Sequence, residues 1–150
     1  MRVVIQRVTE AQVVIEEKIK GKIGKGFMIL VGIEENDNDE DIAWLTKKII
    51  CLRLFDDTAG VMNLPITEIG GEILLISQFT LHALTAKGNR PSYIRAARPE
   101  TAIPIYEKFI FSLSEALGKK IETGSFGADM KVTLTNDGPV TIIIDSKKRE

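Results

Sequence analysis

The first third of the chain consists of short runs of alternating apolar and polar residues, rich in Val and Ile and separated by Gly or charged pairs. These runs are Arg2–Val8, Ala11–Glu17, Ile19–Ile23 and Phe27–Ile33. Alternation with a period of two gives a strand one face for a core and one for solvent, and β-branched side chains fit a pleated surface. The sequence therefore predicts a meander of antiparallel strands, and this restricts the fold to one built on a sheet.

A first amphipathic helix is predicted directly after these strands. Its apolar positions recur every three or four residues and are Ile42, Leu45, Ile49 and Leu52. The acidic run Glu34–Asp41 precedes them and favours a loop with a helix N-cap. The helix is expected over Asp39–Leu52, with Cys51 on its buried side as a small core residue.

A second helix is predicted in the last third of the chain. Its apolar positions are Tyr106, Phe109, Ile110, Leu113 and Leu117. It is expected to begin near Pro99 or Pro104, because proline is tolerated in the first turn of a helix, and to end at Gly118.

Short strands are predicted for much of the remainder. They lie around Leu54 and Met62 and over Glu72–Leu81, Ile121–Ser125, Lys131–Thr135 and Val140–Asp145. No repeat, linker or low-complexity tract divides the chain, so residues 1–150 are expected to form a single domain. The predicted class is α+β, with a mostly antiparallel sheet or barrel and two main helices covering an apolar face.

Composition excludes several classes of protein. With 20 Lys and Arg against 21 Asp and Glu, the net charge of −1 gives no whole-chain argument for binding nucleic acid or membranes. Cys51 is the single cysteine and His82 the single histidine, so an intrachain disulfide and a Cys/His zinc site are excluded. The longest apolar run, Gly26–Ile33, is far shorter than the ~20 residues of a membrane helix. A soluble cytoplasmic protein without metal or cofactor is expected.

The residue inventory also argues against common enzyme mechanisms. Gly21–Gly26 (GKIGKG) has the glycines of a phosphate loop, but Phe27 stands where a Walker A motif needs Lys, so a hairpin turn is favoured. His82 lies two residues from Thr80, and on an extended strand the two would share a face as base and nucleophile. Neighbours on one strand rarely have the facing geometry of a triad, so a surface or rim histidine is favoured.

Two polar segments remain to be explained. Ser77–Leu81 (SQFTL) places three polar side chains at the end of an apolar strand, where sites are commonly built and where ordinary packing also tolerates polar residues. Asn136–Thr141 (NDGPVT) indicates a tight turn between strands. Within it, Pro139 follows Gly138 and begins a strand, a position where an X-Pro bond can be cis and can present two carbonyl groups outward.

Together, in this order and in a chain of this length, SQFTL and NDGPVT resemble the paired signature of the D-aminoacyl-tRNA deacylases, formerly called D-tyrosyl-tRNA deacylases. The resemblance extends over essentially the whole chain and includes Met1–Val8 (MRVVIQRV), Gly88–Tyr93 (GNRPSY) and Gly124–Met130 (GSFGADM). The chain departs from the family pattern at His82–Thr85 (HALT), where members often carry Ala-Asp or Tyr-Ala-Asp.

The resemblance implies a homodimer with active sites at the subunit interface, which hydrolyses the ester bond between a D-amino acid and the 3′ end of tRNA. Gly138 and Pro139 of one subunit would enter the pocket of the other as a cis dipeptide. Their carbonyl oxygens would hold the amino group of the substrate and leave no room for an L side chain, so glycine would also be admitted. Arg7 would fix the orientation of the dipeptide.

The resemblance also implies roles for the residues around the substrate. Those expected to line the pocket are Ser77, Gln78, Phe79 and Thr80, with Phe126 and Met130 near the terminal adenine. One view makes Thr80 a nucleophile; the other uses the backbone N–H groups of Phe79 and Thr80 as oxyanion donors, with the 2′-hydroxyl of the tRNA helping to activate water. The second is favoured, because threonine without a placed base is a poor nucleophile near pH 7 and one oxyanion donor supplies about 2.7–4 kcal/mol.

Two other classes of function stay open. A noncatalytic dimer that binds the end of tRNA would use a basic stretch with no acid between His82 and Pro99 to hold phosphates. Its cations are Lys87, Arg90, Arg95 and Arg98. A small esterase would instead use Thr80 and His82 on free substrates. Because cations and acids are segregated along the chain, the near-zero net charge argues only against nonspecific binding over the whole surface.

Overall fold

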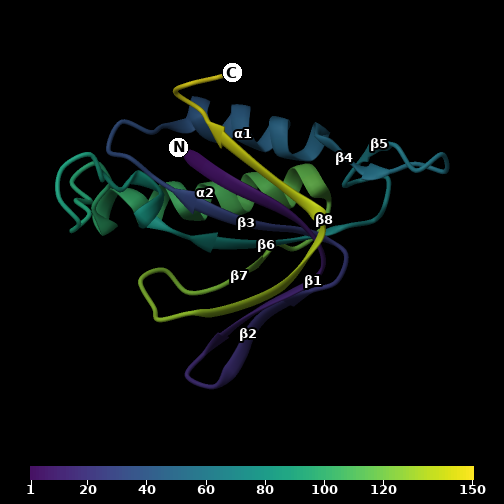
Figure 1. The fold of residues 1–150 in the computed structure, drawn as a ribbon, viewed down its shortest axis with the longest axis horizontal. Coiled ribbons are helices and arrows are strands. Elements are labelled where there is room, and N and C mark those ends of the chain that lie inside the picture. The colour runs from purple at the N-terminus through teal and green to yellow at the C-terminus, as the bar shows by residue number, and fades with distance from the viewer.

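A six-stranded mixed sheet forms the centre of the computed structural model, which describes all of residues 1–150 (Figure 1). The strands follow the order β2-β1-β3-β6-β7, and β8 also pairs with β1. Their bounds are β1 Arg2–Ile15, β2 Lys18–Ile23, β3 Gly26–Gly32, β6 Glu72–Ser77, β7 Glu122–Thr123 and β8 Lys131–Asp145. The remaining elements are α1 Asp39–Cys51, β4 Arg53–Asp56, β5 Met62–Pro65, the 3₁₀ helix η1 Phe79–His82 and α2 Pro99–Leu117.

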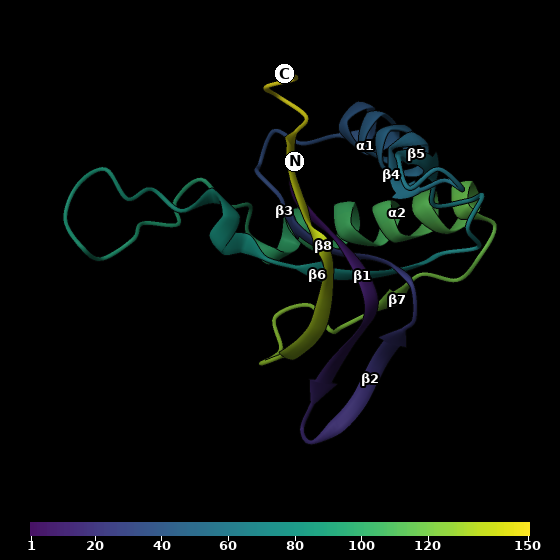
Figure 2. The ribbon, with the colours of Figure 1, turned by 45° about the vertical axis from the view of Figure 1, so that its right-hand side comes forward.

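The predicted class, α+β with two helices over one face of a sheet, is confirmed. The sheet is mixed, because β3 and β6 pair in parallel, as do β6 and β7. The second half of β1 carries β2 away from the helices (Figure 2). There β2 turns back toward β7, and a Cβ at Gly21 would lie 3.0 Å from the carbonyl oxygen of Thr123. This approach nearly closes the sheet into a barrel.

Two predicted divisions between strands were wrong. The runs expected as separate strands within residues 2–17 form one long strand, β1, which pairs with β3 through its first half and with β2 through its second. The tight turn expected at Asn136–Thr141 is part of one continuous strand, β8. In both cases β1 and β8 continue past the polar residues because they pair with each other along almost their whole length.

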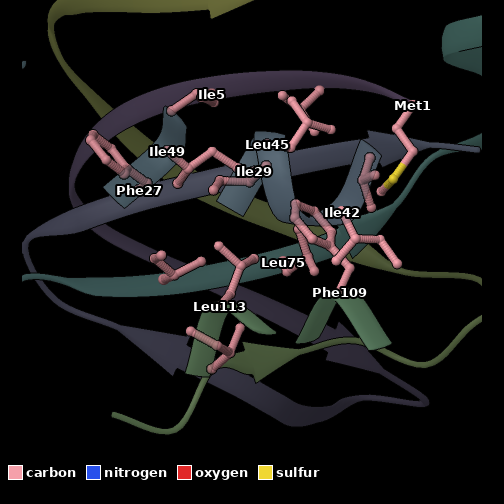
Figure 3. Close-up of a cluster of buried hydrophobic side chains, with 14 of the residues drawn as sticks. Met1, Ile5, Phe27, Ile29, Ile42, Leu45, Ile49, Leu75, Phe109 and Leu113 are labelled. Carbon is pink, nitrogen blue, oxygen red and sulfur yellow. The ribbon is translucent and has the colours of Figure 1, made fainter. Parts of the chain in front are cut away.

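The main hydrophobic core lies between the sheet and the two helices (Figure 3). Helix α1 contributes Ile42, Leu45 and Ile49, and α2 contributes Phe109 and Leu113. The sheet supplies inward-facing side chains that alternate along the strands, among them Val3, Ile5, Phe27, Ile29, Val31 and Leu75. A second, smaller cluster covers the opposite face of the sheet, and its buried members are Val8, Ala11, Val13, Ile23, Met28, Leu74 and Ile76. The parallel strands β3 and β6 are therefore covered on both faces, which explains their continuous apolar sequences.

The helix ends follow the sequence closely. Asn38 caps α1, since its side chain accepts a hydrogen bond from the Glu40 N–H (2.9 Å) while Asp41 accepts one from the Asn38 N–H (3.0 Å). Helix α2 begins at Pro99 and ends at Gly118, whose φ of 70° is left-handed. Neither helix combines the length and apolar character needed to cross a membrane.

The prediction that Cys51 is a core residue was wrong, because its side chain is exposed. Helix α1 buries Ile42, Leu45 and Ile49 along one stripe. Cys51 lies two positions beyond Ile49, which is about 200° around a helix of 3.6 residues per turn, and so faces away from the core.

Candidate active site

A cavity of about 240 Å³ opens beside the carboxyl ends of the parallel strands β3 and β6. Most of its wall is apolar, with the polar side chains Ser77 and Gln78 at the end of β6. The complete lining is Val31, Ile33, Ile76, Ser77, Gln78, Phe79, Ala97, Ala102, Phe126, Gly127, Ala128, Met130 and Val132. A concave apolar pocket with few polar groups is the usual form of a small-molecule or cofactor site.

Strand β6 ends earlier than predicted, and this forms the polar rim of the cavity. The Gln78 N–H still donates to the Val31 carbonyl (2.7 Å), but residues Phe79–His82 turn into the 3₁₀ helix η1. The first hydrogen bond of this turn runs from the Leu81 N–H to the Gln78 carbonyl (3.2 Å), so the N–H groups of Phe79 and Thr80 have no partner within it. The Gln78 side-chain amide donates to the Thr80 hydroxyl (2.5 Å).

His82 is buried, contrary to the expectation of a rim histidine. The residue is 1% exposed, and neither ring nitrogen has a hydrogen-bond partner. The Nδ1 atom lies 3.5 Å from a Glu34 oxygen that also pairs with Arg95 at 2.7 Å. Residues two apart in a 3₁₀ helix point about 240° apart, so Thr80 and His82 do not share a face as they would on a strand. The Thr80 hydroxyl bonds to Gln78 instead.

Phe126 and Met130 also line the cavity. The Phe126 ring packs against Tyr106 with 5.9 Å between ring centroids, and the Tyr106 hydroxyl donates to the Leu75 carbonyl (2.8 Å). Burial raises the pKa of Tyr106 well above its usual value, so this hydroxyl stays protonated as a donor. Met130 packs directly on the backbone of Gly124, where any Cβ would overlap its sulfur atom.

Arg7, Gly138 and Pro139 form a second constellation at a wide bulge. Gln6 pairs with Thr141 and Val8 pairs with Asn136, so Arg7 alone faces the four residues Asp137–Val140. The bulge replaces the predicted turn and exposes Gly138 and Pro139, which are joined by a cis peptide bond. Gly138 has φ 125°, a conformation that side chains other than glycine rarely adopt.

The guanidinium of Arg7 holds the base of this bulge. Arg7 is only 6% exposed, and its Nε atom donates to the Asp137 carbonyl (3.1 Å). Its Nη1 atom donates to the Leu54 carbonyl (2.7 Å) and lies 3.2 Å from the Asp56 carboxylate. The side-chain amide of Asn136 adds two hydrogen bonds, to the carbonyl groups of Arg7 and Val140. The exposed dipeptide therefore projects from a well-anchored base.

Within one chain, the two constellations lie apart. Arg7 pairs with Phe27, whereas Ser77 pairs with Val31, four positions further along β3. At 3.3 Å per residue, these positions are about 13 Å apart along the strand. The cavity thus gathers Ser77, Gln78, Phe79, Phe126 and Met130, with Thr80 attached through Gln78, whereas Arg7, Gly138 and Pro139 do not reach it.

Some residues of the two constellations were missed at the sequence level. Ala97 and Ala102 shape the cavity wall on either side of the start of α2, and Asp56 pairs with Arg7. For the wall residues, the only sequence signal is the small side chains that flank Pro99. Asp56 is followed by Asp57 and Gly60, a composition typical of an ordinary turn. Such wall and partner residues become recognisable only when the elements are packed.

Comparison with known proteins agrees with this geometry. The family model described as D-Tyr-tRNA(Tyr) deacylase matches residues 4–145. The chain is 66% identical to the D-aminoacyl-tRNA deacylase of Bacteroides thetaiotaomicron and 64% identical to that of Flavobacterium psychrophilum, covering 100% of this chain and of each relative.

Two solved structures share the fold. A structure described as the c-Myc DNA unwinding element binding protein has a TM-score of 0.91 and 37% identity, covering 97% of this chain and 98% of the other. A probable eukaryotic D-amino acid tRNA deacylase has a TM-score of 0.83 at 15% identity, covering 95% of this chain and 97% of the other, a likeness of fold alone. By its family-model match and its full-length relatives, the chain belongs to the D-Tyr-tRNA(Tyr) deacylase family.

Proposed function

We propose that this protein hydrolyses the ester bond joining a D-amino acid to the 3′ end of tRNA and releases the free amino acid and tRNA. One observation carries the proposal: the apolar cavity at the end of β6 has the SQFT segment of the family signature, Ser77–Thr80, at its rim. Full-length relatives of 66% and 64% identity are named D-aminoacyl-tRNA deacylases, which supports the same substrate class here.

In the proposed reaction, water attacks the ester carbonyl carbon, and the bond to the ribose 3′-oxygen then breaks. The N–H groups of Phe79 and Thr80, which have no partner within η1, stabilise the oxyanion of the tetrahedral intermediate. The 2′-hydroxyl of the tRNA helps to activate the water, and the leaving 3′-oxygen takes up a proton. Gln78 holds the Thr80 hydroxyl in place. The scheme uses no metal ion and no cofactor.

Substrate binding is divided between the pocket and the bulge in this proposal. The terminal adenine lies against Phe126 and Met130, with Ser77 beside the ester. The carbonyl oxygens of Gly138 and Pro139 hold the amino group of the substrate and exclude an L side chain. Glycine has no side chain, so glycyl-tRNA is also hydrolysed. Arg7 keeps the dipeptide in the orientation that this selection requires.

The active unit in this proposal is a homodimer. Gly138 and Pro139 are exposed, and Arg7, which anchors them, lies about 13 Å along β3 from Ser77 at the cavity of the same chain. The dipeptide therefore suits the cavity of a second copy better. Ile143, which is exposed further along β8, adds apolar surface for such an interface. The cytoplasm is the proposed place of action, since the substrate is tRNA and the chain has one unpaired cysteine.

The experiment that tests this function compares matched D- and L-aminoacyl-tRNAs and glycyl-tRNA under single-turnover conditions. The proposal predicts hydrolysis of the D ester and of glycyl-tRNA, with the L ester spared. Binding without turnover would favour the noncatalytic tRNA-end-binding dimer. Equal hydrolysis of simple esters that lack tRNA would favour the esterase.

A further inference from the structure

The segment between η1 and α2 projects from the body of the molecule as an arm (Figure 2). Leu84 and Ser92 exchange two backbone hydrogen bonds of 2.8 and 3.0 Å, which close the base of the arm around residues 85–91. On its other side, the Ala97 N–H donates to the Ile33 carbonyl (2.8 Å), and both residues line the cavity. The arm is therefore anchored at the rim of the cavity.

Exposed aromatic surface connects the cavity to this arm. Phe79 lines the cavity and is nevertheless 55% exposed. The ring of Tyr93, 39% exposed, meets the Phe79 ring edge to face with 5.1 Å between centroids. The next residue, Ile94, is 83% exposed, and none of the three belongs to either hydrophobic core cluster. The Phe79 and Tyr93 rings, here called the Phe79–Tyr93 step, form a continuous aromatic surface that leads out of the cavity.

The charge of the arm is positive and unpaired. Lys87 and Arg90 form no ion pair, and the sequence has no acid between His82 and Pro99. The other two cations of the predicted basic stretch lie at the base of the arm, beside carboxylates. Arg95 pairs with Glu34 at 2.7 Å. The backbone N–H of Arg98 donates to the Glu35 carboxylate at 2.7 Å, whereas the Arg98 guanidinium forms no ion pair. On the arm itself, beyond its base, the charge available for phosphate lies at Lys87 and Arg90.

We propose that this surface binds the unpaired nucleotides that precede the terminal adenosine of the tRNA, an inference that rests on the proposed function. The Phe79–Tyr93 step stacks the penultimate base, and Lys87 and Arg90 contact the phosphates beyond it. Two observations select this occupant. The step continues the wall of the cavity that holds the terminal nucleotide, and the cations complement a phosphate backbone. Aromatic rings beside cations are the usual surface for single-stranded nucleic acid.

The phosphate contacts are tested by the salt dependence of kcat/KM. The double variant Lys87→Ala/Arg90→Ala is compared with Lys20→Ala, which removes an exposed cation on β2. For D-aminoacyl-tRNA, the slope of log kcat/KM against log salt should become shallower by about 1.4 in the double variant. Each lost contact with a single-strand phosphate contributes about 0.7 to this change. Lys20→Ala should leave it unchanged. A D-aminoacyl ester of adenosine alone should be hydrolysed equally by all three proteins. An unchanged slope in the double variant would overturn the phosphate contacts.

The stacking contact is tested with substrate analogues. Tyr93→Leu is compared with Tyr93→Phe on a D-aminoacyl RNA hairpin with an unpaired 3′ end, prepared with and without the penultimate base. Tyr93→Leu should lower kcat/KM about 10-fold on the intact end, as expected for one stacked base, and much less on the abasic end. Tyr93→Phe keeps the ring and should match the parent protein on both.

An equal loss on both RNA ends would show that Tyr93 only supports Phe79, and would overturn the stacking contact. Failure of the proposed function gives a different result, because the parent protein would then hydrolyse neither the D-aminoacyl-tRNA nor the adenosine ester. If the parent protein is active but the variants change neither the salt slope nor kcat/KM on the RNA substrates, the proposed RNA contact is contradicted. The arm would then be a candidate surface for a protein partner.

Discussion

The Thr80 hydroxyl accepts a hydrogen bond from Gln78 and has no imidazole beside it. Such a hydroxyl positions substrate or water better than it attacks an ester, because nothing takes its proton near pH 7. Thr80→Ala should therefore lower the single-turnover rate by no more than about 10-fold, the range of one neutral hydrogen bond. Loss of nearly all activity, with tRNA binding and folding intact, would instead identify Thr80 as the nucleophile.

The buried His82 ring separates the deacylase from the esterase hypothesis. Both ring nitrogens lack hydrogen-bond partners, so an apolar side chain of similar size loses no such contact. His82→Leu should keep the parent rate of D-aminoacyl-tRNA hydrolysis and an unchanged or higher urea midpoint of unfolding. A folded His82→Leu protein without activity would make His82 the general base.

Gly138 determines the shape of the bulge. Its φ is 125°, and a Cβ there would lie 2.8 Å from the Val140 side chain and 3.2 Å from Arg7. Gly138→Ala should move the dipeptide and lower the ratio of D- to L-aminoacyl-tRNA hydrolysis by about 10-fold or more, the range of one misplaced methyl group. Gly60→Ala is the matched control, because Gly60 also has positive φ but no atom within 4 Å. An unchanged ratio in Gly138→Ala would contradict the role of the dipeptide in selection.

At the scale of elements, local sequence patterns correctly predicted the helices, whose hydrogen bonds lie within one segment. The spacing of apolar residues predicted both helices; α1 begins at the predicted Asp39, and Gly118 ends α2 as predicted. Sequence patterns failed where the conformation of a segment depends on the strand that pairs with it. Strand β8 continues through Asn136–Thr141 because β1 pairs with it on both sides of the bulge. The 3₁₀ turn at Phe79–His82 likewise has the same apolar alternation as a strand.

The hydrogen bonds at the start of α1 predict that the stability of the protein depends on pH. Asp41 accepts hydrogen bonds from Lys147 Nζ (2.6 Å) and from the Asn38 N–H (3.0 Å). Burial by itself would raise the pKa of Asp41, but these hydrogen bonds outweigh it and hold the pKa below its usual value. A depressed folded-state pKa gives stability that is present above the unfolded pKa of about 4 and is lost as pH falls through the folded value.

Asp41→Asn should consequently lower the free energy of unfolding by about 1 kcal/mol at pH 7, because the neutral amide loses the charge-assisted hydrogen bond from Lys147. The difference from the parent protein should shrink as pH falls below 4, where the parent carboxylate also becomes protonated. Urea unfolding at several pH values measures it. Asp39→Asn is the control, because its ion pair with Lys108 is exposed and contributes little. A difference that is constant from pH 7 to pH 3 would contradict the assignment.

At the scale of the whole molecule, the sequence and its family resemblance predicted one group of neighbouring residues but not the separation of the two constellations. Ser77–Phe79, Phe126 and Met130 were expected together, and the cavity brings them together. The distance between Arg7 and Ser77 follows from the pairing of β1 and β6 with β3, which no local pattern specifies. One chain thus carries the two constellations as separate surfaces, and two copies are needed to combine them in the proposed site.

Subunit mixing tests this division most directly. Ala128→Trp fills the cavity, and Pro139→Trp enlarges the bulge that is proposed to enter the partner's cavity. Each variant alone should be inactive on D-aminoacyl-tRNA. In an equal mixture refolded together, half the dimers are mixed and each has one intact site, so about a quarter of the parent activity should return. If the mixture stays as inactive as the separate variants while forming mixed dimers, the site does not combine residues from two chains.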